Sequence, residues 1–88
     1  MFGNNNDLGA ALFKTWTEAE RKNEIKKLVT GYRNGVPIGI LCTMSETIAG
    51  SKKTAKKYLR QFMTETERTE AISAAEINIK PIVIEFLG

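Results

Sequence analysis

The side chains with the clearest chemical use in this sequence are five cations gathered in one short segment. Residues 47–64 contain these five bases and no acidic residue, whereas residues 1–46 carry six bases and five acids and residues 65–88 carry two bases and five acids. Because an ordinary exposed face interleaves both signs, a cluster of one sign favours a polyanionic partner. The five cations are Lys52, Lys53, Lys56, Lys57 and Arg60.

A single helix must position these cations. Ser51 is a good N-cap, and the residues after it predict a helix that runs to about Met63. Apolar residues recur on one side of this helix at helical spacing, which separates a side facing the core from a basic outer side. The apolar stripe consists of Ala55, Tyr58, Leu59 and Phe62. The outer side carries Lys53, Lys57 and Arg60, with Lys56 at its flank.

We expect this helix to bind double-stranded DNA. Lysine mainly neutralises phosphates, which gives affinity without sequence information. Arg60, Lys53 and Thr54 are the better candidates for contacts with base edges, and the free backbone amides at the start of the helix suit a phosphate. Two alternatives stay open: RNA or another polyanion, and a merely solvated lysine-rich face. The candidate DNA-binding residues are Ser51, Lys52, Lys53, Thr54, Lys56, Lys57 and Arg60.

Two further helices are indicated on either side of this segment. Residues 17–20 read Thr-Glu-Ala-Glu, which is a capping box and predicts the start of a helix over 17–34. This helix should end at Asn34-Gly35, with Pro37 beyond it. Residues 66–75 predict another helix, capped by Thr66 or Thr64.

The remaining segments are less uniform. Residues 36–44 suit either a short buried strand or the approach to a helix. Residues 77–87 are rich in branched and aromatic residues, which predicts a strand, and Pro81 places that strand at a sheet edge or gives it a kink. Residues 1–6 predict a flexible tail, and a short helix over 7–14 is expected.

The chain is short enough for one domain, which we expect over residues 7–88. The expected fold is mainly α, with three to five short helices and a C-terminal β-strand that acts as a wing or pairs two protomers. Gly50 and Ser51 form a turn between the basic helix and the one before it, so residues 44–59 resemble a helix-turn-helix, whose second helix lies in the major groove. One difference is that Gly50 stands where such proteins usually have an apolar residue.

A second resemblance rests on Ala49-Gly50, Ser-Lys-Lys-Thr-Ala at 51–55 and Thr-Glu-Ala-Ile at 69–72. Together with the acidic helix start at 17–20, this pattern resembles the DNA-binding region of bacteriophage terminase small subunits. Those proteins have an aromatic residue between the glycine and the serine, which this chain lacks. The resemblance implies recognition of viral DNA for packaging by a ring-forming oligomer without enzymatic activity.

Composition argues against catalysis and metal binding. The chain has no histidine and one cysteine, Cys42; it therefore lacks the usual general base, a nucleophile–histidine pair and a zinc site of the usual ligands. Cys42 lies among apolar neighbours and is expected in the core. We expect no enzyme activity, no cofactor and no metal.

Location and partners follow from the same features. The N-terminus does not read as a secretory signal and no apolar run is long enough to cross a bilayer, so we expect a cytoplasmic protein, in the host cytoplasm if it is viral. The leading hypothesis is a phage- or plasmid-type transcriptional regulator that binds DNA as a dimer or larger homo-oligomer. The alternative is a small adaptor or inhibitor that docks on a partner protein through the strand over 77–87.

Overall fold

The computed structural model describes residues 15–88, which form five helices. Their bounds are α2 at Glu18–Arg33, α3 at Ile38–Ala49, α4 at Lys52–Phe62, α5 at Glu65–Ala74 and α6 at Lys80–Leu87. The expectation of a mainly α fold is therefore confirmed. The expected tail over 1–6 and helix over 7–14 lie outside the described residues.

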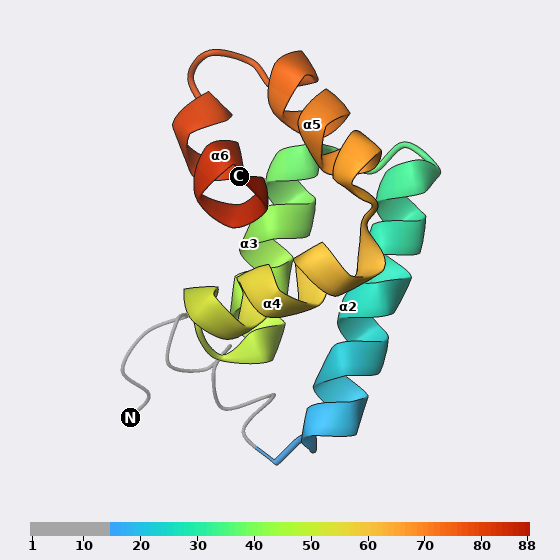
Figure 1. Ribbon diagram of the computed structural model, residues 1–88. Helices are drawn as coiled ribbons and strands as arrows, with labels where there is room; N and C mark the ends of the chain where they lie inside the picture. Colours follow the sequence, from blue (N-terminus) through green and yellow to red (C-terminus); the bar gives the residue numbers. More distant parts are fainter. Residues whose placement is uncertain (1–14) are drawn as a thin grey trace.

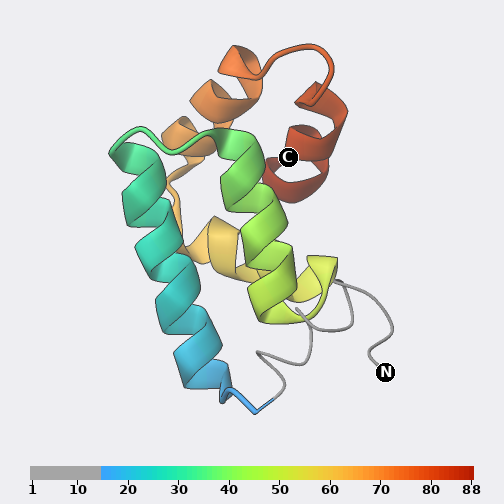
Figure 2. The same ribbon diagram turned by 180° about the vertical axis from the view of Figure 1, so that it is seen from behind.

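Three helices build the centre of the fold. α2 and α3 run antiparallel to each other, and α4 crosses them both (Figures 1 and 2), so that each of the three contacts the other two. α6 packs against α3, α4 and α5. The fully buried side chains come from four of the helices, and the largest of them are Ile25, Val29, Leu41, Cys42, Leu59, Val83 and Leu87.

The helix boundaries follow the capping chemistry of the sequence. Thr17 caps α2 in a capping box, in which its hydroxyl accepts from the Glu20 amide and the Glu20 carboxylate accepts from the Thr17 amide. Thr64 caps α5 in the same way. The predictions for these two helices are confirmed, with Thr64 rather than Thr66 as the cap of α5.

The alternatives for residues 36–44 are resolved in favour of a helix. Pro37 is the N-cap of α3, and residues from Ile38 onward are helical. Helical spacing brings Leu41, Ser45 and Ile48 to the buried side of α3. The branched residues that suggested a strand lie outside this buried side: Val36 and Ile40 are exposed, and Ile38 is half-buried.

The expected β-strand over 77–87 is wrong. Residues 80–87 form α6, and no strand occurs within residues 15–88. Pro81 stands in the first turn of α6, where its missing N–H needs no helical partner. Val83, Phe86 and Leu87 then fall on one side and are buried. A pattern of branched residues predicts a strand, but it also fits a short helix packed on a core.

One ion pair ties the end of α2 to α5. The Arg33 guanidinium donates to both carboxylate oxygens of Glu67 at 2.7 Å and to the Phe62 carbonyl oxygen at 3.0 Å. The hydrogen bonds from Arg33 and from the Thr64 amide lower the pKa of Glu67 to about 2. Arg33 therefore fixes the junction where α4 ends and α5 begins.

Candidate nucleic-acid interface

The turn that precedes α4 sets the direction in which its side chains point. α3 ends at Gly50, whose φ of 88° lies in the left-handed region that glycine adopts readily. Ser51 then has an extended backbone, and its hydroxyl accepts from the Thr54 amide at 3.2 Å. Two residues thus turn the chain from α3 into α4, which crosses it (Figure 1). The predicted roles of Gly50 in ending α3 and of Ser51 in capping α4 are confirmed.

α4 buries one side completely. Ala55 and Leu59 have no exposed surface, and Tyr58 is 3 % exposed. The Tyr58 hydroxyl donates to the Glu18 carboxylate of α2 at 3.2 Å. Burial, followed by the charge of Glu18, raises the pKa of Tyr58. The buried stripe fixes the rotation of α4, so the side opposite must face outward.

Three of the predicted cations lie on that outward side without an ionic partner. Lys53 and Lys57 are exposed and Lys56 is half-buried. Among residues 15–88, no acidic side chain forms a salt bridge with any of these three lysines. Their charges are therefore available to an external anion.

The other two cations are engaged by α6. The Lys52 ammonium lies 2.9 Å from a Glu85 carboxylate oxygen and 5.8 Å from the centre of the Phe86 ring. The hydrogen bond to Glu85 raises the pKa of Lys52. The Arg60 guanidinium donates to the Gly88 carbonyl oxygen at 2.6 Å. These contacts leave Lys52 and Arg60 at the α6 edge of the basic side, where each can also meet a phosphate with its remaining donors.

Thr54 is placed less favourably for base recognition than the lysines. It is half-buried, and its hydroxyl oxygen accepts from the Ser51 hydroxyl at 3.0 Å while its amide takes part in the cap. These bonds leave one hydroxyl proton for an external acceptor. Ser51 itself is exposed at the start of the helix.

Two cations on α2 lie outside the cluster that the charge pattern of the sequence predicts. Lys22 and Lys26 line a hollow with Phe62 at the end of α4. Along the chain they lie among acids at positions 18, 20 and 24, so the local balance of charge concealed them. The signal that could have found them is their spacing of four residues, which places both on one side of α2.

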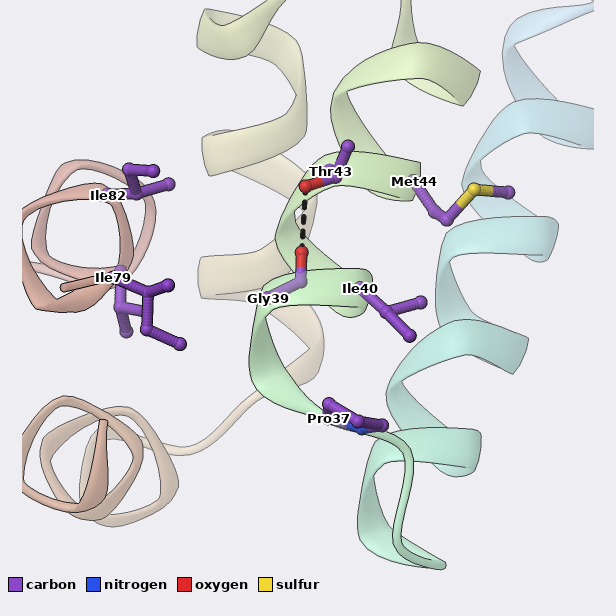
Figure 3. A pocket seen from close by; sticks show the side chains of 8 residues that line it. Pro37, Gly39, Ile40, Thr43, Met44, Ile79 and Ile82 are labelled. Atoms are coloured by element: carbon purple, nitrogen blue, oxygen red, sulfur yellow. Dashed lines mark hydrogen bonds between the residues drawn. The ribbon is translucent and has the colours of Figure 1, made fainter. Parts of the chain in front are cut away.

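An apolar groove lies on a different surface, over α3 and the start of α6 (Figure 3). Ile79 and Ile82 lie on one side of it and Ile40 and Met44 on the other, with Gly39 between them. A Cβ at Gly39 would lie 3.9 Å from the Ile79 side chain, an ordinary van der Waals contact, so Gly39 and Ile79 face each other across the floor of the groove. No charged residue lines it.

The described residues offer little else that could act chemically. Cys42 is fully buried, as predicted, and burial raises the pKa of its thiol to about 11. In this part of the chain no group of three or more acidic, cysteine or histidine side chains could hold a metal ion. None of the helices between residues 15 and 88 is both long and apolar enough to span a bilayer.

Comparisons of the chain with protein-family models, with curated proteins and with solved structures give no match. Any function is therefore inferred from the arrangement of α3, α4 and the lysines.

Proposed function

We propose that this chain binds double-stranded DNA through a helix-turn-helix made of α3 and α4. One observation carries the proposal: Lys53, Lys56 and Lys57 project from a helix whose opposite side is buried, and no acid within residues 15–88 pairs with them. Phosphate contacts of this kind supply most of the affinity of non-specific DNA binding.

The way α4 is held supports the proposal. Its start is fixed by the Ser51 cap and its end by the hydrogen bond from Arg33 to the Phe62 carbonyl oxygen. Its buried stripe packs against α2 and α3. A helix positioned in this way meets the DNA groove without first having to be ordered, which lowers the entropic cost of binding.

The test is a salt titration of binding to a random-sequence DNA duplex, followed by fluorescence anisotropy. If three to five cations each neutralise one phosphate, log K should fall against log salt with a slope of about −3 to −5. An RNA duplex is measured in parallel. The comparison tests whether the chain has a higher affinity for B-form DNA than for A-form RNA. No binding to either duplex at low salt would contradict the proposal, and preferential RNA binding would overturn its DNA assignment.

The proposal includes self-association, and we assign the apolar groove over α3 and α6 to a second copy of the chain. Ile40, Met44 and Ile82 are 50 %, 39 % and 46 % exposed there. The chain carries a net charge of +3, which opposes self-association, so the contact that costs least is one that brings no further like charges together. This groove offers such a contact, and it leaves the basic side of α4 uncovered.

A single charge in the groove should prevent this self-association. In Ile40→Glu two carboxylates would be brought into an apolar contact, so sedimentation equilibrium should show a monomer where the unchanged chain shows a dimer. Ile77→Glu is the matched control, because Ile77 is 89 % exposed and lies outside the groove. A monomeric unchanged chain, or equal effects of the two substitutions, would refute this assignment.

A further inference from the structure

We infer that the DNA-binding surface continues from α4 onto α2, where Lys22, Asn23 and Lys26 form a second contact for the phosphate backbone of the same duplex. This inference rests on the proposed function. It adds a helix to the interface that the charge pattern of the sequence does not reveal.

The position of Phe62 connects the two helices. Phe62 is the last residue of α4, and its side chain lines a hollow of about 250 Å³ together with Ala19, Lys22, Asn23 and Lys26. The Arg33 guanidinium holds the Phe62 carbonyl oxygen at 3.0 Å, so the end of α4 is anchored to α2. The hollow therefore lies at the end of the basic helix, where that helix is hydrogen-bonded to α2.

The side chains of the hollow suit a sugar–phosphate backbone. Lys22 and Lys26 supply two cations one helical turn apart, and the Asn23 amide supplies hydrogen-bond donors. The partly buried ring of Phe62 gives an apolar surface against which a deoxyribose can pack. Within residues 15–88, no salt bridge or side-chain hydrogen bond occupies either lysine.

The acidic residues of α2 do not form ion pairs with the two lysines of the hollow. Glu24 pairs with Lys27 at 3.1 Å, and Glu18 accepts a hydrogen bond from the Tyr58 hydroxyl at 3.2 Å. Glu20 is the partner of the Thr17 amide in the cap of α2. Each of these carboxylates is thus bound to a group of this chain, and none pairs with Lys22 or Lys26.

The separation of the two contacts favours a long polyanion over a small anion. Lys53 and Phe62 are nine residues apart on α4, a rise of roughly 14 Å at about 1.5 Å per residue. This rise corresponds to about four base pairs of duplex at about 3.4 Å each. A duplex laid along α4 would thus reach from Lys53 to the end of the helix that lines the hollow, whereas one phosphate ion would not.

The experiment compares full-length chains in the same anisotropy titration with a random-sequence DNA duplex. Lys22→Gln with Lys26→Gln should weaken binding at about 0.1 M salt by roughly tenfold or more and make the salt slope shallower by about two. Lys27→Gln is the matched control, because it removes one charge from α2 at an exposed position outside the hollow. Its affinity should stay within about twofold of the unchanged chain. Lys53→Gln with Lys57→Gln serves as the reference for loss of the α4 contacts.

The outcomes separate the inference from the proposed function. If the α4 variant loses affinity and the Lys22 and Lys26 variant matches the Lys27→Gln control, the inference is wrong and the function stands. If the unchanged chain does not bind the duplex, the proposed function fails and the inference with it. Losses in both variants, each with a shallower salt slope, support the extended surface. Circular dichroism of each variant checks that the helices are retained.

Discussion

Replacing Lys53 and Lys57 together by glutamate is expected to lower affinity for a DNA duplex by roughly a hundredfold or more at about 0.1 M salt. The change removes two phosphate contacts and adds two like charges that repel the backbone. Both lysines are exposed and lie opposite the buried stripe of α4, so the circular dichroism spectrum should stay unchanged. Retention on immobilised DNA and anisotropy both measure the effect.

The control reverses two other lysines. Lys27 lies on α2, away from the basic side of α4. Lys80 lies at the start of α6, whereas the contacts with Lys52 and Arg60 are made at the other end of that helix. Lys27→Glu with Lys80→Glu changes the net charge by the same amount. If this control lost as much affinity as the α4 variant, net charge rather than the surface of α4 would explain binding.

Local chemistry made most helices of this fold predictable. The capping boxes at Thr17 and Thr64, the left-handed glycine at Gly50 and the cap at Ser51 act through neighbours four residues away or closer. Such interactions are encoded in contiguous sequence. The turn that aims α4 could therefore be expected before any packing was known.

α6 could not be predicted in the same way, because its form depends on distant partners. The sequence of residues 80–87 has the branched residues of a strand and a proline that fits either a strand edge or a first helical turn. Contacts with α3, α4 and α5 decide in favour of a helix, since they bury Val83, Phe86 and Leu87 together. An adaptor would not dock through an edge strand over 77–87, because residues 80–87 form α6.

The candidate interface was predictable only in part for the same reason. The charge pattern along residues 52–60 identified the basic helix, because a cluster within one helix is visible in sequence. It could not show that Glu85 pairs with Lys52 or that the Gly88 carbonyl holds Arg60, since α6 is distant in sequence. It likewise could not place Lys22 and Lys26 beside Phe62.

Replacing Leu59 by alanine is expected to destabilise the fold by about 2–5 kcal/mol. Leu59 has no exposed surface and belongs to the side of α4 that packs on the core, so truncation leaves a cavity under the basic helix. In a chain of this size the thermal midpoint should fall by roughly 10–30 °C. Thermal and urea unfolding followed by circular dichroism measure the loss.

A companion substitution on the same helix isolates the role of burial. Gln61 is exposed, so Gln61→Ala should change stability by only about 0.5 kcal/mol. Equal midpoints for the two variants would show that Leu59 is not part of the core. If DNA binds the folded chain and not the unfolded chain, as the proposed function requires, duplex at about 100 times Kd should restore roughly 2.7 kcal/mol to Leu59→Ala. Recovery of the midpoint with duplex would show that the lysines opposite Leu59 still bind DNA once α4 is folded. The reason is that Leu59→Ala weakens the packing of α4 on the core but leaves the lysines on its outward side unchanged.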